Sequence, residues 1–492
     1  MEPQAGEFSR RRVPWLAPLR LSSALSQGIM LFQSLRRFTG IDRSVGLVIL
    51  SRVWTLWAGP VTLFCITRFL SPVEQGFYYT FNSIIGLNIF LEMGLSLVLM
   101  QFASHEMAEL SWTSRDTLAG SEINKRRLAA IFRQSLRWYS FAAILVSITT
   151  LPAGMYFFAR TAGAESASWR GPWICLSLLS AMNLCLIPLF ALFEGVGKVS
   201  TVVLIRVLQG IAAGFMLWLA LALDFSLFAG PLYQVTSVAV AAICFWSFFR
   251  RCLLDLFRVD HGLADFSWRR EVWPLQWKIA ISCLSSYFVV QLFNPVLFAN
   301  HGPIAAGKMG MSITLIGVIQ GTCNAWVVTK SATFGIFIAR EQFEELDRVF
   351  FRALVQSSCF FALGALVLFL SLIYLRNHGY SFANRVLEPL PLFLLICGGF
   401  IQSFVNSQAT YLRAHKQEPF LWITLAGGAV VGLSTLLLGP PFGATGILSG
   451  YVLGSLTIGG ASTYVFFRKR QEWHTLSDVA AQVRQSENDS RS

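Results

Sequence analysis

Charged residues are scarce in this sequence. They make up 13% of its 492 residues, whereas a soluble domain carries about 25%. Hydrophobic residues account for 54% of the chain, and its mean hydropathy is +0.57. This balance excludes an ordinary soluble globular protein and indicates a polytopic membrane protein.

Paired cysteines and metal-binding spacings are also missing. The nine cysteines stand singly, almost all within apolar runs, where a cysteine acts as a small apolar side chain. No Cys-x-x-Cys or Cys/His spacing occurs, so the sequence indicates neither a disulfide framework nor a zinc site. A complete Gly-x-x-x-x-Gly-Lys-Ser/Thr loop is absent too, which argues against ATP hydrolysis. We therefore expect no metal and no cofactor.

Long apolar runs, in contrast, are abundant. A bilayer core of ~30 Å takes about 20 helical residues, and the sequence contains twelve runs of roughly that length. They predict an all-α fold with about twelve transmembrane helices. The runs are approximately residues 46–69, 77–100, 132–159, 172–193, 201–223, 230–249, 279–299, 307–329, 349–375, 391–412, 420–438 and 445–467.

The two halves of the chain resemble each other weakly. The stretch that ends at Gly307 aligns on the stretch that ends at Gly76, a shift of 231 residues, and two further matches have a shift of 218. We interpret the chain as two six-helix lobes, 45–250 and 279–468, joined by a basic linker, 251–278. Six spans per lobe give both lobes the same orientation, which is typical of alternating-access transporters with a central cavity between two parallel repeats.

Basic residues gather in the loops on one side of the predicted spans. With twelve spans both termini lie on that side, and the positive-inside rule assigns it to the cytoplasm. The same asymmetry explains the net charge of +13 and the pI near 9.6. Nucleic-acid binding is therefore not needed to explain the charge, and we expect none.

The two ends of the chain are polar or basic. Segment 1–44 is strongly basic, and Arg20 interrupts its apolar run, which argues against a signal peptide. Its pattern is compatible both with a helix at the cytoplasmic interface and with a disordered tail. We expect the tail, 469–492, to be cytoplasmic and disordered beyond His474.

The first predicted hairpin carries a family resemblance. Its loop reads Arg68-Phe-Leu-Ser-Pro-Val-Glu-Gln-Gly76-Phe-Tyr-Tyr, and the following helix contains Phe90-Leu-Glu-Met-Gly-Leu. This pattern resembles the start of polysaccharide exporters of the MOP superfamily, and the resemblance covers roughly residues 45–470. It implies a Wzx-type flippase, a multi-pass protein of the bacterial inner membrane. Such a protein moves a lipid-linked oligosaccharide or polysaccharide precursor for O-antigen, lipopolysaccharide or another surface glycan.

The resemblance also implies partners and alternatives. The expected partners are membrane lipid, a polyprenyl-diphosphate-linked glycan and other membrane proteins of polysaccharide assembly. An ion-coupled multidrug antiporter of the same superfamily is one alternative. A membrane-embedded glycan polymerase or glycosyltransferase is another, but the outer loops, 160–171 and 376–389, are short and lack an Asp-Asp or Asp-x-Asp pair. We therefore expect that the chain is not an enzyme.

Charges inside the spans are the first candidates for a substrate site. A diphosphate crosses a low-dielectric core more readily when cations pair with it. Arg52, Arg206 and Glu92 all lie roughly 10 Å from the cytoplasmic surface at 1.5 Å per residue. We predict that the two arginines bind the anionic head of the substrate and that Glu92 holds one of them in place. The alternative is that both arginines reach the inner headgroups and that Glu92 forms a structural ion pair.

Amides inside the spans are the second set of candidates, because they suit sugar hydroxyls. Hydrogen bonds between helices explain such residues equally well. Three prolines inside spans, Pro60, Pro152 and Pro188, are expected to bend or break their helices. The amides predicted to contact the glycan are Asn88, Gln291, Asn294, Asn324, Gln402 and Asn406.

Overall fold

The structure is a computed structural model that describes most of the chain. This part is almost entirely helical, with one short antiparallel hairpin formed by β1, Leu110–Trp112, and β2, Leu118–Gly120. Segment 1–42, most of the linker and the first part of the seventh predicted span lie outside the described residues. The described residues are 43–92, 94–113, 116–161, 168–259, 273, 277, 290–415 and 419–489.

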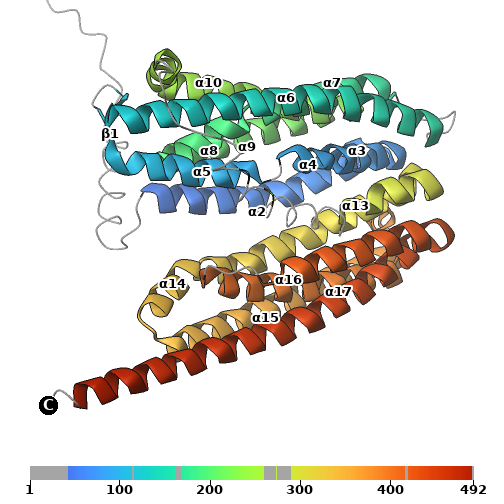
Figure 1. Cartoon of the computed structure of the whole chain (residues 1–492). Helices are drawn as coiled ribbons and strands as arrows, with labels where there is room; N and C mark the ends of the chain where they lie inside the picture. Colours follow the sequence, from blue (N-terminus) through green and yellow to red (C-terminus); the bar gives the residue numbers. More distant parts are fainter. Residues whose placement is uncertain are drawn as a thin grey trace, which may run out of the picture.

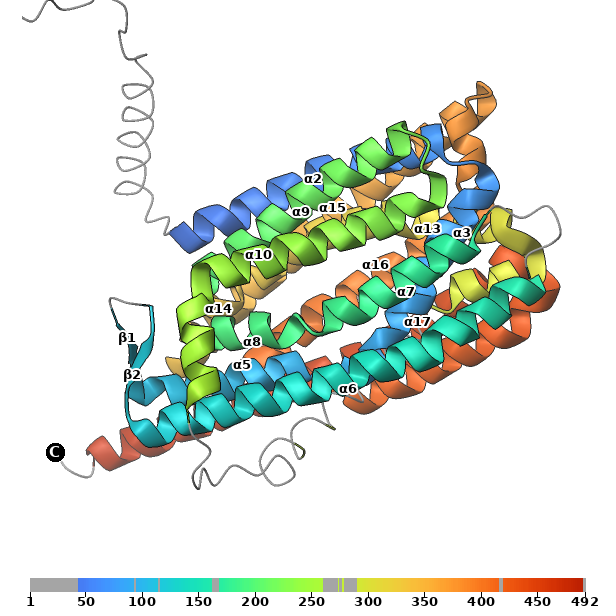
Figure 2. The ribbon, with the colours of Figure 1, turned by 90° about the horizontal axis from the view of Figure 1, so that it is seen from above.

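The first lobe contains spans one to six. Seen from above, α2, α9 and α10 lie side by side, α7 and α8 occupy the middle, and α5 and α6 form the other edge (Figure 2). The helices are α2 (Arg43–Phe69), α3 (Pro72–Ile85), α4 (Ile89–Glu92), α5 (Leu95–Glu106), α6 (Glu122–Thr161), α7 (Arg170–Leu184), α8 (Ile187–Gly195), α9 (Val199–Ala222) and α10 (Ala229–Arg258).

The second lobe contains the remaining spans. Two of its helices, α13 and α17, each join two spans across a glycine with non-helical backbone. These are Gly302 and Gly443, whose φ values of +81° and +58° favour glycine. The helices are α13 (Phe293–Val328), α14 (Ser331–Ala339), α15 (Phe343–Asn377), α16 (Pro389–Ala414) and α17 (Leu421–Asp489), with a 3-10 helix at Ser381–Arg385.

The predicted architecture is confirmed. Eight helices of the described residues are long and apolar enough to cross a membrane. Helix α2 and the broken span α3–α5 add two spans, and the breaks in α13 and α17 divide two of the eight helices into two spans each. The total is the twelve predicted spans, the seventh of which is described only in part. Figure 1 shows the two lobes, α2 to α10 above and α13 to α17 below. The chain is an all-α polytopic membrane protein with two lobes.

Two spans of the first lobe are broken rather than continuous. Span two, expected as one helix over 77–100, consists of α3, a 3-10 turn over Gly86–Asn88, α4 and α5, with Gly94 at φ +64°. Span four breaks between α7 and α8, where Pro188 lies in the first turn of α8. The prediction for Pro188 is confirmed. Helices α2 and α6 continue through Pro60 and Pro152, so these two prolines do not break their spans.

Several predicted boundaries were wrong. Helix α3 begins at Pro72, because Ser71 and Glu74 form a reciprocal cap at its N-terminus. Helix α14 lies between the predicted runs 307–329 and 349–375, where no helix was expected, and α10 extends into the expected linker. Helix α17 continues to Asp489, so the tail is helical where disorder was expected.

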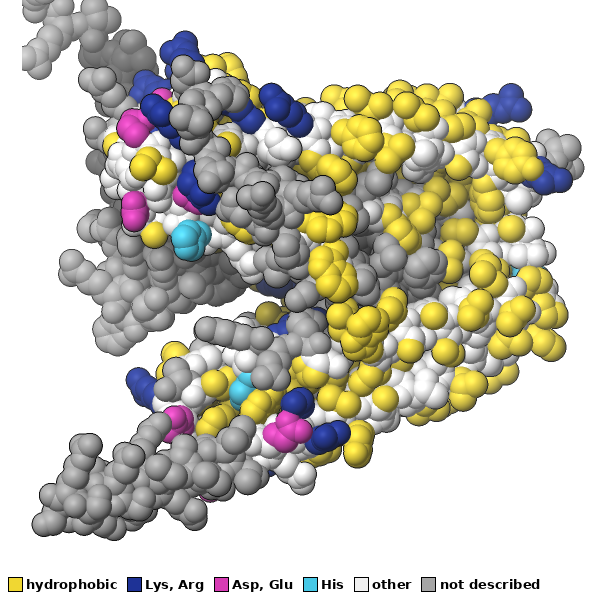
Figure 3. All heavy atoms as spheres, in the orientation of Figure 1, with side chains coloured by type: hydrophobic (Ala, Val, Ile, Leu, Met, Phe, Trp, Pro, Cys, Tyr) yellow, Lys and Arg dark blue, Asp and Glu magenta, His cyan; other side chains and the backbone are white. Residues whose placement is uncertain are grey.

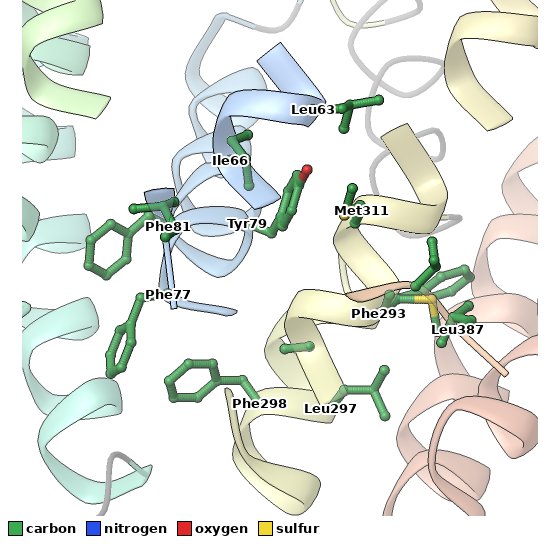
Figure 4. Close-up of a cluster of buried hydrophobic side chains, with 14 of the residues drawn as sticks. Leu63, Ile66, Phe77, Tyr79, Phe81, Phe293, Leu297, Phe298, Met311 and Leu387 are labelled. Atoms are coloured by element: carbon green, nitrogen blue, oxygen red, sulfur yellow. The ribbon is translucent and has the colours of Figure 1, made fainter. Parts of the chain in front are cut away.

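The two lobes meet where α3 lies against α13. A Cβ on Gly76 would lie 2.0 Å from the carbonyl oxygen of Pro303, so the two backbones approach each other only because Gly76 has no side chain. Rings from both lobes surround this contact, and the centroids of Phe77 and Phe298 are 4.9 Å apart. Figure 4 shows these buried side chains converging from α2, α3 and α13. This end of the molecule is closed.

The opposite end of the molecule is open. Figure 3 shows a wedge-shaped opening between the lobes there, and Lys, Arg, Asp and Glu side chains gather around it. The β1–β2 hairpin and the end of α17 lie at this end (Figure 1). By the positive-inside rule, this is the end expected at the cytoplasm.

The orientation leads to a labelling prediction. Ser71 and Asn384 are exposed residues at the closed end, so single cysteines placed there should react with an impermeant maleimide on intact cells. A cysteine at Ser477, in the last part of α17, should react only after the cells are opened. The same chain without cysteines serves as the control. Labelling of position 477 on intact cells, without labelling of positions 71 and 384, would reverse the orientation.

Candidate functional site

Arg52 lies on the face of α2 that is turned toward the second lobe. Seven residues are close to two helical turns, so Arg52, Gly59 and Ile66 share one face. A Cβ added to Gly59 would lie 3.6 Å from Cγ2 of Val318, so Gly59 is next to α13. Ile66 is buried in the core common to both lobes. Further toward the open end, this face of α2 is no longer covered by α13, and Arg52 is exposed. We infer from this helical repeat that Arg52 faces the opening.

No acidic partner of Arg52 is found in the part of the chain that the structure describes. An arginine within a membrane span normally pairs or faces a water-filled cavity. The exposure of Arg52, together with its place on the face of α2 that meets α13, is compatible with the second case. Its guanidinium is available for an anion.

Arg206 lies at nearly the same depth on the neighbouring helix. Trp218 of α9 donates a hydrogen bond of 2.9 Å to Thr62 of α2, and α2 and α9 run parallel. By this register Arg206 is level with Leu50, two residues from Arg52, or roughly 3 Å along the helix axis. The structure thus brings the two predicted arginines to neighbouring levels of the first lobe.

The predicted ion pair of Glu92 with an arginine is wrong. Arg206 instead pairs with Glu194 at 2.8 Å, and its guanidinium lies 4.5 Å from the ring centroid of Phe190. Both partners are on α8, which a tight turn connects to α9, so the pair is local to that helical hairpin. The sequence signal for the Arg206–Glu194 pair was the position of Glu194 directly before the Gly-Val-Gly-Lys turn. Arg206 is therefore largely neutralised, whereas Arg52 is not.

Glu92 lines a separate polar cavity inside the first lobe. The cavity has a volume of about 400 Å³ and lies between broken span two, broken span four and α10. The Glu92 carboxylate accepts a hydrogen bond of 2.5 Å from Ser96, one turn further along the chain. The polar side chains around this cavity are Asn82, Asn88, Glu92, Ser180, Asn183 and Gln234.

The other predicted amides divide into two groups. Asn294 is buried and donates to Ser83, and Asn324 accepts from Ser403, so both tie helices together. These contacts are the hydrogen bonds between helices that the alternative interpretation expected. Gln291, Gln402 and Asn406 are at least partly exposed. Gln402 lies close to Asn406 on α16, with 3.4 Å between Nε2 and Oδ1.

A polar latch between the lobes at the closed end was not predicted. The Arg385 guanidinium donates to the carbonyl oxygen of Leu70 at 2.7 Å. Gln75, which is fully buried, donates to the carbonyl oxygens of Gly307 and Arg385 at 2.9 and 3.1 Å. Burial lowers the pKa of the Arg385 guanidinium, and Glu74 acts in the opposite direction. We call this set of contacts the outer latch.

The second lobe carries an open apolar groove. It has a volume of about 740 Å³ and is lined by side chains of α15, α16 and the second span of α17, among them Phe361, Phe369, Phe393 and Leu456. The lining is apolar throughout, so the groove suits a hydrocarbon chain and no polar group.

Comparison with solved structures shows the fold. An inward-facing multidrug resistance MATE family transporter of the MOP superfamily has a TM-score of 0.55 and 15% identity, with 90% of this chain and 98% of that chain covered. The lipid II flippase MurJ in an inward closed conformation has a TM-score of 0.54 and 12% identity, over 89% and 91% of the chains. The MATE multidrug transporter DinF-BH in complex with R6G has a TM-score of 0.54 and 11% identity, over 87% and 95%.

Sequence comparisons add no closer relative. No protein-family model matches the chain, and no curated protein matches it. The shared fold is the twelve-helix, two-lobe fold of MOP superfamily transporters, and these structural neighbours are transporters rather than enzymes.

Proposed function

We propose that this protein moves a lipid-linked oligosaccharide or polysaccharide precursor across the bacterial inner membrane by alternating access. The observation that carries the proposal is Arg52, an exposed cation without an acidic partner among the described residues, on the face of α2 that meets the second lobe at Gly59. The resemblance of the first hairpin to polysaccharide exporters supports it. So does the similarity to a lipid II flippase.

The charge at the opening fits an anionic head group. A diphosphate that leaves water loses hydration, and a guanidinium compensates for this loss with two parallel charge-assisted hydrogen bonds. Arg52 provides such a guanidinium, while Arg206 and Glu194 provide a neutral pair at a neighbouring depth. In this proposal Arg52 binds the diphosphate, and Gln402 and Asn406 are candidates for contacts with the glycan.

The shape of the molecule fits loading from the cytoplasmic side. The lobes are separated at the charge-rich end and closed by the outer latch at the other end. A glycan lipid made at the inner leaflet would enter through the opening with its head group, while its isoprenoid tail stays in the bilayer. The apolar groove of the second lobe offers such a tail a surface. Both termini are cytoplasmic in this proposal.

Deletion of the gene tests the proposed function. We expect surface polysaccharide to disappear and a polyprenyl-diphosphate-linked glycan to accumulate at the inner leaflet, where mass spectrometry of extracted lipids identifies it. The wild-type gene on a plasmid should reverse both effects. Normal surface polysaccharide, with no accumulated glycan lipid in the deletion strain, would contradict the proposal.

Multidrug antiport is the second candidate function. The Glu92 cavity favours it, because an intramembrane carboxylate suits a cationic substrate, and two of the compared structures are MATE transporters. Against it, the opening itself presents Arg52, which repels cations.

The two candidates differ in a simple growth test. Expression in a host without its own efflux pumps is expected to leave resistance to cationic dyes unchanged, because no acidic side chain was found to balance Arg52 at the opening in the described residues. Dye efflux is measured by fluorescence of loaded cells, with empty vector and a known exporter as controls. Efflux that depends on an ion gradient and on Glu92 would establish the antiporter instead.

A further inference from the structure

The loop between α15 and α16 carries the second-lobe part of the outer latch. It contains the 3-10 helix Ser381–Arg385, and Arg385 reaches across the lobe boundary to the end of α2. We propose that Arg376, in the last turn of α15, is a positioning residue of the latch: it holds this loop in the shape that brings Arg385 to α2. The proposal rests on the alternating access of the proposed function, but not on the identity of the transported molecule.

Arg385 binds carbonyl groups at the C-terminal end of α2. The last carbonyl oxygens of a helix have no partner within the helix, and a basic side chain there also interacts favourably with the helix dipole. The Nη2 atom of Arg385 donates to the carbonyl oxygen of Leu70 at 2.7 Å and to that of Thr67 at 3.4 Å. Both acceptors belong to the first lobe, so separation of the lobes at this end breaks both contacts.

The main chain of Arg385 makes a further contact with the first lobe. Its carbonyl oxygen accepts a hydrogen bond of 3.1 Å from the fully buried side chain of Gln75 on α3. This bond and the two contacts with α2 therefore depend on where the loop places a single residue. A displacement of the loop by about 1 Å would take all three beyond the usual hydrogen-bond distance.

Arg376 holds this loop on both sides of Arg385. Its Nη2 atom donates to the carbonyl oxygens of Ala383 and Leu387, both at 3.1 Å. The two acceptors lie two residues before and two residues after Arg385 in the chain. Ala383 and Leu387 are buried, so their carbonyl groups have little access to water and depend on this donor. The guanidinium of Arg376 thus fixes the segment from which Arg385 extends.

A second anchor ties the same loop to α13. The backbone N–H of Leu387 donates to Oγ of Ser312 at 3.0 Å, and the Leu387 side chain belongs to the buried cluster of Figure 4. The loop is therefore ordered by contacts within the second lobe, before Arg385 meets α2. Order that exists in advance lowers the conformational entropy lost when the lobes close. Without Arg376, part of that order must be regained at every closure.

The reactivity of a buried cysteine between the lobes tests this role. Met309 is fully buried on α13, the helix that packs against α3. In the purified full-length protein, a single cysteine at position 309 should react with a polar maleimide only when the closed end opens. Arg376→Ala should raise the reaction rate roughly fivefold, and so should Arg385→Ala, as is typical for lost hydrogen bonds of a charged group. Both changes together should raise it by much less than the product of the two factors, because Arg376 acts through Arg385.

Two further variants calibrate the measurement. Arg376→Gln retains a shorter donor and should raise the rate by a smaller factor than Arg376→Ala. The matched control is Arg160→Ala, which removes an arginine from the last turn of α6. Arg160 donates to the hydroxyl of Tyr156 on its own helix at 2.7 Å, so the rate at position 309 should not change.

A second reporter separates this role from a general loosening of the second lobe. Cys323 is fully buried in that lobe, and as the only cysteine of the chain it should react equally fast with and without Arg376→Ala. Three results would overturn the proposal: an unchanged rate at position 309 in both Arg376 variants, factors that multiply in the double variant, or an equal rise at Cys323. The assay contains no glycan lipid, so its failure leaves the proposed flippase function standing.

Discussion

Arg52→Gln is expected to abolish surface glycan while the protein remains at its wild-type level in the membrane. Arg52 is an exposed cation at the opening without an acidic partner among the described residues, so its removal leaves the phosphate groups of the substrate uncompensated. Loss of such a charged contact costs about 2–5 kcal/mol. At 1.4 kcal/mol per factor of ten, this corresponds to roughly 30-fold to several thousand-fold weaker binding. Surface glycan is measured by immunoblot against a tagged, quantified protein.

Two further variants separate binding from anchoring. Arg52→Lys should restore export in part, because the charge survives but the two-pronged hydrogen bonding does not. Arg206→Gln should have a smaller effect than Arg52→Gln, since Glu194 already neutralises Arg206. If Arg52 only reached the inner headgroups, lysine would replace it fully and Arg52→Ala would lower only the amount of protein. Normal export by Arg52→Gln would refute the cationic site.

Gly76→Ala is expected to open the closed end of the molecule. The added Cβ would lie 2.0 Å from the carbonyl oxygen of Pro303, and backbone lies on both sides of this contact, so α3 and α13 must separate. Met309, which is fully buried near this contact, is the reporter. In a chain without other cysteines, a cysteine at position 309 should react with a polar maleimide roughly tenfold faster or more when Gly76→Ala is present.

Gly317→Ala is the matched control for this prediction. Gly317 also lies on α13, but no atom comes within 4 Å of the Cβ that alanine would add, so the reaction rate should not change. Arg385→Ala should raise the rate by a smaller factor, because it removes hydrogen bonds of the outer latch without forcing backbones apart. Equal rates for the Gly76→Ala chain and its parent would contradict tight closure at α3 and α13.

The lobes and spans could be predicted from the sequence because the bilayer imposes a length on every apolar run. The helical face of Arg52 could also be predicted, because the seven-residue spacing from Arg52 to Gly59 and Ile66 places all three residues on one face of α2. What the sequence could not supply was the element that this face meets. The approach of Gly59 to Val318 in the structure identifies it as α13.

The missed features depend on contacts between distant segments. Gln75 and Arg385 are separated by 310 residues, and no pattern in either segment indicates the other. The break of span two was missed because Gly86 and Gly94 lie inside an apolar run that is long enough for one continuous span. The pairing of Arg206 with Glu194 rather than Glu92 is decided by a turn between two helices. Glu92 was the expected partner because it lies at the same depth in the membrane as Arg206. Equal depth does not determine which helices are neighbours.

Transport of a glycan lipid by the purified protein tests the central claim most directly. The protein is reconstituted into liposomes that carry a fluorescent polyprenyl-diphosphate oligosaccharide in both leaflets, and an external quencher reports which molecules reach the outer leaflet. We expect wild-type protein to expose the inner-leaflet pool and the Arg52→Gln variant to leave it protected, as protein-free liposomes do. A pool that stays protected with folded wild-type protein, under imposed proton and Na⁺ gradients alike, would contradict the proposed flippase function.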